Sequence, residues 1–272
     1  MSHLKGRVVA VTGAASGFGK LVSEKALTLG AQVLAMDIDE DGLTGLPESA
    51  DLLTAKVNVT QLADIRAAVQ QVVDKWQRLD VMINNAGIMP LAFYQDHADA
   101  MPAWDRCIDI NIKGVLNGIV AVYDQMIAQG RGHVVNLSSI YGNFPVVGAG
   151  VYGASKAAVD FLSSSLRMET QGKIKVTTVK PTGVPGTNLG TGIINPEAIV
   201  GILGHKAPAY SQLMEAHQSG ELPAEYTDAD HIEYYALEPE HLADQIVHAI
   251  DQPWGVTISE ITVRASGDAY IL

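Results

Sequence analysis

Short apolar runs rich in β-branched residues alternate along the chain with longer amphipathic stretches, and this alternation narrows the possible folds most. Strands are predicted at residues 7–11, 32–36, 54–59, 80–83, 133–137, 174–179 and 256–263. The clearest helical pattern has an apolar stripe from Leu62 to Trp76 and follows Thr60, a predicted cap residue. The alternation predicts an α/β fold with a doubly wound parallel sheet of about seven strands and helices on both faces.

One segment breaks this rhythm. From Asn188 to about Glu238, glycines, prolines and polar residues interrupt every periodic pattern. Because the segment follows a predicted strand end, we expect residues 188–238 to be a substrate lid or binding loop with short helices. The alternative is an insertion that only extends the surface. The sequence contains no linker, so the 272 residues are expected to form a single domain, 1–272.

The charge and cysteine content exclude several classes of function. The chain has 18 basic and 30 acidic residues and a net charge of −12, which argues against nucleic acid and anionic membranes as partners. Cys107 is the single cysteine and is expected to be a packed helix thiol rather than a nucleophile. No signal peptide or membrane span is recognised, so a cytoplasmic protein is expected. The histidines have no metal-ligand spacing, and no metal is expected.

A glycine-rich turn follows the first predicted strand and opens a helix. Its sequence is Thr12-Gly13-Ala14-Ala15-Ser16-Gly17-Phe18-Gly19. Glycines allow a tight turn there and let a pyrophosphate reach the N–H groups at the helix N-terminus. About 20 residues later Asp37 closes the second strand, where a ribose hydroxyl needs an acceptor. Together these features predict a dinucleotide site, whereas no Gly-Lys-Ser/Thr follows to make a Walker-type loop.

Three side chains near the middle of the chain have a spacing typical of alcohol–ketone chemistry. Tyr152 and Lys156 are four residues apart in a helix-like stretch, so both lie on one face, and Ser139 follows a predicted strand. An ammonium about 4 Å away, at an effective dielectric of about 20, stabilises a phenolate by a few kcal/mol. We therefore expect Lys156 to lower the pKa of Tyr152 toward working pH, while Ser139 holds the substrate oxygen.

With these motifs, the chain resembles the short-chain dehydrogenase/reductase family in its single-domain form over nearly its whole length. The family's T-G-x-x-x-G-x-G turn corresponds to residues 12–19 and its N-N-A-G element to residues 84–87. The resemblance implies a Rossmann-like fold and four catalytic residues: Asn111, Ser139, Tyr152 and Lys156. It also implies a kinked helix at Asn111 and a water that links the lysine to solvent. Ser139 fits the family interval to the tyrosine better than Ser138 does.

The resemblance also implies where a nicotinamide cofactor binds. Contacts are expected from Gly13, Ser16, Gly17, Phe18, Gly19, Asp37, Ile38, Asn58, Val59, Asn85, Ala86, Gly87, Tyr152, Lys156, Pro181, Val184 and Thr187. Asn58 stands where the family often has an aspartate, and its amide oxygen is expected to accept from the adenine amino group. The segment after the sixth strand, residues 181–187, has a threonine for the family's first glycine and one extra residue. Thr187 is nevertheless expected to contact the carboxamide.

The expected cofactor is NAD rather than NADP. A 2′-phosphate beside Asp37 would place two like charges in contact. The neighbouring residues offer no cation to compensate: they are Met36, Ile38, Asp39, Glu40 and Asp41. Ser16 also stands where NADP-preferring relatives often carry a basic residue.

The sequence therefore predicts an NAD(H)-dependent oxidoreductase that interconverts a secondary alcohol and a ketone. The alternatives are a sugar-nucleotide epimerase or dehydratase on the same fold and a non-catalytic nucleotide-sensing regulator. A mainly apolar substrate pocket is expected from Leu91, Phe93, Tyr141, Val146, Val147 and Met214. The absence of a well-placed arginine or lysine argues against hydroxy acids. By resemblance and from apolar outward helix positions around residues 115–126 and 159–168, a homotetramer or a dimer is expected.

Overall fold

Alternate residues of the first strand belong to two different hydrophobic cores, as expected for a strand covered on both faces. In the computed structural model, which describes residues 2–185 and 187–271, Val9 and Val11 pack in one core and Val8 and Ala10 in the other. Within the described chain, seven strands form one parallel sheet in the order β3-β2-β1-β4-β5-β6-β7. The predicted α/β class and doubly wound sheet are confirmed. Gly186 and the two end residues of the predicted 1–272 domain lie outside the described residues.

The strands begin and end close to their predicted positions. They are β1 (Val8–Thr12), β2 (Gln32–Asp37), β3 (Leu52–Lys56), β4 (Val81–Asn84), β5 (Gly132–Leu137), β6 (Ile174–Pro181) and β7 (Glu260–Val263). Two predictions were wrong by several residues. β3 begins and ends earlier than 54–59, and β7 begins at Glu260 instead of 256. Val256 is held in a turn, because its N–H donates to the Pro253 carbonyl and its own carbonyl accepts from Lys175 Nζ at 2.8 Å.

The helices lie between the strands, as the alternation predicted. They are α1 (Gly17–Thr28), α2 (Glu40–Leu43), α3 (Leu62–Trp76), α4 (His97–Cys107), α5 (Gly114–Ala128), α6 (Gly150–Glu169), α7 (Val200–Leu203), α8 (Ala207–Ser219) and α9 (Pro239–Ile250). A π-helix, η2 (Ile108–Lys113), joins α4 to α5. The cap prediction for α3 was wrong. The capping position is Gln61, because the Thr60 N–H and hydroxyl both donate to the Asn58 side chain.

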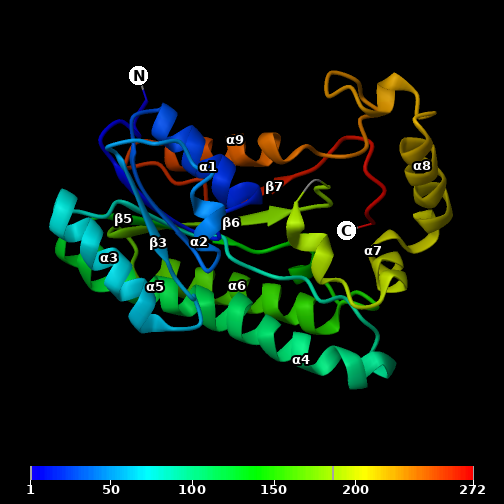
Figure 1. Ribbon diagram of the computed structural model, residues 1–272, viewed down its shortest axis with the longest axis horizontal. Coiled ribbons are helices and arrows are strands. Elements are labelled where there is room, and N and C mark those ends of the chain that lie inside the picture. Colours follow the sequence, from blue (N-terminus) through cyan, green and yellow to red (C-terminus); the bar gives the residue numbers. More distant parts are fainter. Residues whose placement is uncertain (1, 186, 272) are drawn as a thin grey trace.

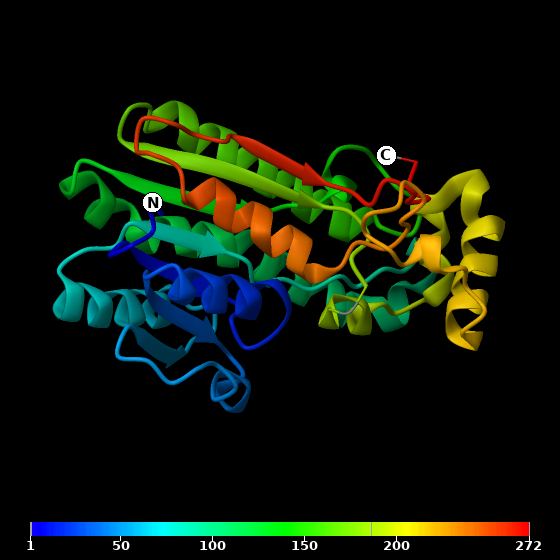
Figure 2. The same cartoon turned by 90° about the horizontal axis from the view of Figure 1, so that it is seen from above.

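Helices cover the sheet from both sides (Figure 1). One core joins α1 and α9 to one face through Val22, Ala26, Leu242 and Ile246. The other core joins α3, α5 and α6 to the opposite face, and Figure 2 shows the same layers from above. None of the helices in residues 2–185 and 187–271 is long and apolar enough to cross a membrane.

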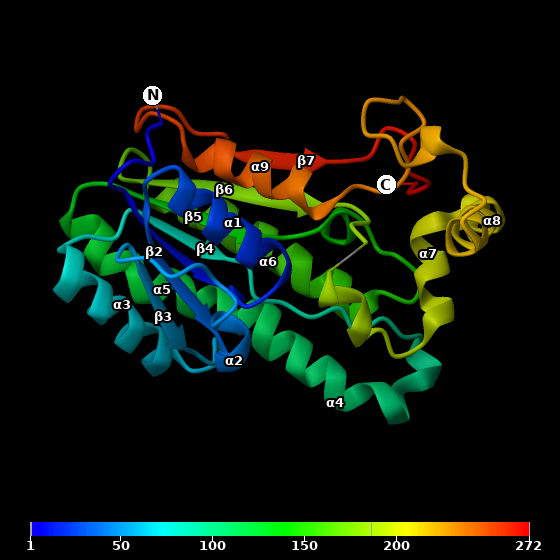
Figure 3. The same cartoon turned by 45° about the horizontal axis from the view of Figure 1, so that its top comes forward.

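The segment 188–238 extends beyond the carboxyl ends of the strands, with α7 and α8 at the far end of the molecule (Figure 3). Ala198, Ile202 and Leu203 are buried in a third core with Tyr141 and Tyr152. α8 lies farther out, and none of its described side chains is fully buried. The segment thus has a packed inner part and a less buried outer helix.

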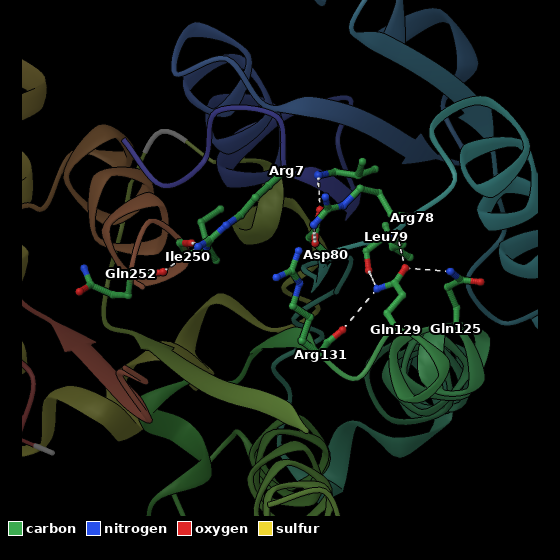
Figure 4. Close-up of polar contacts among 10 residues, drawn as sticks. Arg7, Arg78, Leu79, Asp80, Gln125, Gln129, Arg131, Ile250 and Gln252 are labelled. Carbon is green, nitrogen blue, oxygen red and sulfur yellow. Dashed lines mark hydrogen bonds and ion pairs between the residues drawn. The ribbon is translucent and has the colours of Figure 1, made fainter. Parts of the chain in front are cut away.

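A polar cluster lies at the amino ends of the strands, at the opposite end of the sheet from the cleft residues and the segment 188–238 (Figure 4). The buried Asp80 carboxylate accepts from the Val8 N–H at 2.9 Å and from Arg78. The Arg7 guanidinium donates to the carbonyls of Ile250 and Gln252 at 2.7 and 3.0 Å, which satisfies the last turn of α9. These bonds fix the amino ends of the strands.

Candidate active site

A cleft of about 580 Å³ opens at the carboxyl ends of the strands, where ligands bind in open parallel sheets. Almost every residue predicted to bind the cofactor or act in catalysis lines it. The lining residues among them are Gly13, Ser16, Gly17, Phe18, Asp37, Ile38, Asn58, Val59, Asn85, Ala86, Gly87, Ser139, Tyr152, Lys156, Pro181, Val184 and Thr187. Gly19 and Asn111 do not line the cleft, and both act on residues that do.

The glycine-rich turn is held in shape by Asn85. The Asn85 amide donates to the carbonyls of Thr12 and Gly13, at 2.9 and 3.1 Å. Gly13 has φ +68°, and a Cβ there would lie 2.8 Å from Asn85 Nδ2. A Cβ on Gly19 would lie 2.1 Å from the Gly13 carbonyl oxygen, so this glycine lets the first turn of α1 pack against the loop. Side chains at these positions would collide with Asn85 and with the loop backbone, and would therefore disrupt the turn that a pyrophosphate has to approach.

Asp37 closes β2 at the rim of the cleft. One of its carboxylate oxygens accepts from the Ala15 N–H at 2.9 Å, and the other from the Asp39 N–H at 3.0 Å. These two bonds fix the carboxylate beside the glycine-rich turn, and each oxygen keeps a lone pair for a further donor. Ile38 beside it is 62% exposed.

The Asn58 side chain is arranged differently from the prediction. Its amide oxygen already accepts two hydrogen bonds from Thr60, one from the N–H at 3.1 Å and one from the hydroxyl at 2.9 Å. Both lone pairs of that oxygen are therefore engaged. The predicted bond from an adenine amino group to this oxygen is not supported by the geometry, although Asn58 does line the cleft.

Ser139, Tyr152 and Lys156 come together at the inner end of the cleft. α6 carries Tyr152 and Lys156 one turn apart, with 3% and 6% of their surfaces exposed. The Ser139 side chain acts on the Tyr152 phenol and lowers its pKa in part. Ser138 instead donates to the Lys156 carbonyl at 3.0 Å, so its hydroxyl binds the helix backbone. The geometry thus brings Ser139, and not Ser138, to the tyrosine.

Burial dominates the electrostatics of this cluster. The prediction that Lys156 lowers the pKa of Tyr152 was wrong for the chain alone. Burial raises the pKa of Tyr152 above its ordinary value, and the bond from Ser139 lowers it only in part. Lys156 Nζ lies 5.8 Å from the centre of the Tyr152 ring and donates to the Leu137 carbonyl at 2.8 Å. Burial also lowers the pKa of Lys156 to about 8.

Asn111 lies behind the cleft in the π-helix η2, and its side chain bonds both backbone groups of Ile88. Its amide oxygen accepts from the Ile88 N–H, and its amide nitrogen donates to the Ile88 carbonyl, each at 2.9 Å. The irregular helix predicted at this asparagine is present. Cys107 is buried beside it, as expected, and burial raises the pKa of its thiol, which disfavours a nucleophilic thiolate.

The substrate end of the cleft differs from the prediction. Of the six residues expected to form the pocket, Tyr141 lines the cleft, while Leu91, Phe93, Val146, Val147 and Met214 do not. Leu91 is fully buried, and Val147 is 72% exposed. Tyr210 of α8 and Tyr270 near the C-terminus line the cleft instead. No periodic pattern or motif in the sequence points to Tyr270, which follows the last strand in an irregular tail.

The comparisons with known proteins agree with this geometry. The family model described as short chain dehydrogenase matches residues 7–197. The chain belongs to the short-chain dehydrogenase family. An uncharacterized oxidoreductase of Listeria monocytogenes is 34% identical over 269 residues, which is 96% of each chain. The protein is thus an oxidoreductase of this family, and its fold and family were both predicted correctly.

Two further similar proteins have named activities. An NADP-dependent 3-hydroxy acid dehydrogenase of Salmonella typhi is 34% identical over 183 residues, covering 66% of this chain and 73% of that one. The closed form of a serine dehydrogenase complexed with NADP⁺ has a TM-score of 0.77 and 26% identity, and covers 97% of each chain. Among the residues that the structure describes, no group of three or more histidine, cysteine, aspartate or glutamate side chains is placed to hold a metal ion.

Proposed function

We propose that this short-chain dehydrogenase is an NAD(H)-dependent enzyme that interconverts a secondary alcohol and a ketone, with Tyr152 as the acid and base. The observation that carries the proposal is the buried group of Ser139, Tyr152 and Lys156 in the same cleft as Asp37. A nucleotide-sensing regulator has no need of a phenol and an ammonium placed together at the inner end of its cleft. The lining residues also lack the features of a metal-dependent site.

In the proposed oxidation, Tyr152 accepts the hydroxyl proton of the alcohol, and Ser139 holds the same oxygen through its hydroxyl. NAD⁺, when bound in this cleft, would supply the hydride acceptor and a positive charge. Because burial alone raises the pKa of Tyr152, its ionisation depends on positive charge, and Lys156 contributes a cation one helical turn away. Asn111 acts indirectly, because its bonds to Ile88 fix the backbone beside Gly87.

The residues of the cleft fit a dinucleotide. The turn at Gly13 and Gly17 has positive φ angles and no side chains, so backbone can approach a pyrophosphate. Lys156 is also proposed to bind the ribose next to the nicotinamide. Its Nζ would lie only 3.5 Å from a Cβ on Gly87, a residue of the cleft wall, which supports this role. Pro181, Val184 and Thr187 line the same cleft.

Asp37 supports NAD over NADP, although two relatives are named for NADP. A 2′-phosphate on the adenosine ribose would meet a fixed carboxylate, which costs several kcal/mol when desolvated. Lys56 is the β3 partner of Asp37 in the sheet, but its ammonium lies 3.7 Å from the Glu40 carboxylate. The cation is therefore already paired with an acid.

Spectrophotometry of NADH formation with a panel of secondary alcohols tests the proposal. We expect turnover with several alcohols in the presence of NAD⁺ and the reverse reaction with the matching ketones. An enzyme that bound NADH but turned over no alcohol or ketone would contradict the proposal and support the regulator.

A further inference from the structure

The C-terminal tail folds back onto the carboxyl edge of the sheet and ends between the strands and α8 (Figure 1, Figure 3). Arg264 donates to both oxygens of the Asp268 carboxylate and to the Tyr270 carbonyl, the last at 2.7 Å. On the other side of Tyr270, the Ile271 N–H donates to the Ile202 carbonyl at 3.2 Å. The tail is thus tied down before and after Tyr270, which fixes where that side chain points.

Tyr270 points into the cleft at Gly183. A Cβ on Gly183 would lie only 1.6 Å from the Tyr270 hydroxyl oxygen. Gly183 is not among the glycines with positive φ, so its missing side chain serves to make room for the phenol rather than to permit a turn. Tyr270 also packs against the hydrophobic core that contains Tyr141 and Tyr152, so it lies at the same end of the cleft as the proposed acid and base.

Tyr210 of α8 reaches the same place from the outer side. Its ring centre is 6.3 Å from that of Tyr270, and the Tyr210 phenol contributes to the raised pKa of Tyr270. Tyr141 packs edge-on against Tyr152 with ring centres 5.4 Å apart. Four phenols therefore line the substrate end of the cleft. Burial raises the pKa of Tyr270, so its hydroxyl stays neutral at working pH.

The charges around this wall limit what can bind there. Among the described residues that line the cleft, Lys156 is the single cation. Its proposed role is to stabilise the Tyr152 phenolate and to bind the cofactor. A substrate carboxylate at the tyrosine wall would lose its hydration without gaining an ion pair, which is costly. An uncharged oxygen would instead exchange water for a phenol hydrogen bond at little cost.

We infer that Tyr270 and Tyr210 form a subsite for a second, uncharged oxygen of the substrate, so that the enzyme acts on neutral diols and hydroxyketones rather than on hydroxy acids. This inference rests on the proposed alcohol–ketone activity. Tyr270 is in this account a specificity-determining residue, and Tyr152 remains the group that moves the proton. The family model ends at residue 197, so the tail belongs to the part of the chain that this match does not cover.

Three substrates with a four-carbon skeleton test the inference: sec-butanol, the vicinal diol of butane, and β-hydroxybutyrate. The kcat/KM of the unmodified enzyme should be at least about tenfold higher for the diol than for either of the others. Tyr270→Phe keeps the ring but removes the hydroxyl. It should lower kcat/KM for the diol about tenfold, which corresponds to about 1.4 kcal/mol, chiefly by raising KM. The kcat/KM for sec-butanol should change less than about twofold. Tyr226→Phe, in the segment 188–238 but outside the cleft lining, should change the kcat/KM of neither substrate.

The outcomes separate the inference from the proposed function. A preference for β-hydroxybutyrate, or a Tyr270→Phe variant with an unchanged ratio of diol to sec-butanol, would overturn the subsite while leaving the alcohol–ketone activity in place. Equal losses for the diol and for sec-butanol would also overturn it, since they would indicate a general packing role. No turnover of any of the three would instead contradict the proposed function itself.

Discussion

At the level of single residues, Asp37 leads to the most specific prediction, which concerns the choice between NAD and NADP. Its carboxylate is fixed by the N–H groups of Ala15 and Asp39, and repulsion from a 2′-phosphate should favour NAD over NADP at least about a hundredfold in kcat/KM. Replacing Asp37→Ser together with Ile38→Arg should narrow or reverse this ratio, because a cation replaces the anion at the rim. Steady-state rates with both cofactors measure it. Equal activity of the unmodified enzyme with the two cofactors would be incompatible with the role given to Asp37.

The buried His133 should make the free energy of unfolding depend on pH. The Thr177 hydroxyl donates to the Ile258 carbonyl, so it accepts from His133 Nε2 at 2.8 Å, and Nδ1 is the unprotonated nitrogen. Within the described residues Nδ1 has no hydrogen-bond partner. Burial, with smaller contributions from Lys175 and Arg7, lowers the pKa of His133 to about 3. Charging this ring in the folded protein is therefore unfavourable.

Because the unfolded histidine titrates near 6.5, the unfolded state binds the extra proton first as the pH falls. Above about pH 6.5 His133 is neutral in both states, and its contribution to the free energy of unfolding is fully present. Between about pH 6.5 and pH 3 this contribution is lost, and the free energy of unfolding falls by up to about 1.4 kcal/mol per pH unit. His133→Gln keeps a donor for Thr177 and should flatten this part of the pH profile in urea unfolding. His205→Gln, at an exposed position, should not. Identical slopes for the His133 variant and the unmodified protein would refute the assignment.

The sequence predicted the cofactor end of the site far better than the substrate end. Gly13, Asp37, Tyr152 and Lys156 lie on or directly after regular elements, so their spacing determines where they meet. Tyr270 lies in an irregular tail, and its position depends on long-range bonds from Arg264 and Ile271 that no local pattern encodes. The prediction of a lowered pKa for Tyr152 was wrong for a related reason, because the burial that raises this pKa depends on the assembled fold.

At the level of elements, the sequence located the strands through their apolar runs, but the bounds of β3 and the start of β7 were wrong. Lys175 binds the Val256 carbonyl, so β7 begins later than predicted. The bounds of α3 were predicted correctly but its cap was not, because the Thr60 donors bind Asn58 and Gln61 is left at the capping position. Short helices were expected within residues 188–238, but the bounds of α8 were not predicted, because its 13 residues lack a clear apolar stripe and none of the described ones is fully buried. Helices that pack weakly give weak sequence patterns.

The same weak packing predicts motion in the lid. α8 should exchange its amide hydrogens faster than α7, whose Ile202 and Leu203 are buried, and should slow when NADH and a substrate ketone bind, because Tyr210 then packs against ligand. Hydrogen–deuterium exchange by mass spectrometry resolves the two helices, and α7 serves as the internal control. Exchange in α8 that both ligands together leave unchanged would argue against a lid.

For the whole molecule, the long helices predict self-association. Phe161 and Met168 on α6 are 79% and 74% exposed, and Leu116 and Val120 on α5 are 42% and 38% exposed. We propose that these faces pack in a homotetramer, or in a dimer. Light scattering should give a mass well above the 28.9 kDa of one chain. Phe161→Arg should lower that mass, whereas Ile232→Arg, at an equally exposed site on the outer segment, should not. A monomer at micromolar concentration would contradict the proposal.

The most direct test of the account compares the unmodified enzyme with Tyr152→Phe in two measurements on the same samples: kcat for a secondary alcohol with NAD⁺, and NADH affinity by fluorescence titration. Tyr152 moves the substrate proton in this account, so kcat should fall at least a hundredfold while NADH affinity stays nearly unchanged. A variant that kept more than about a tenth of kcat would show that Tyr152 is not the acid and base.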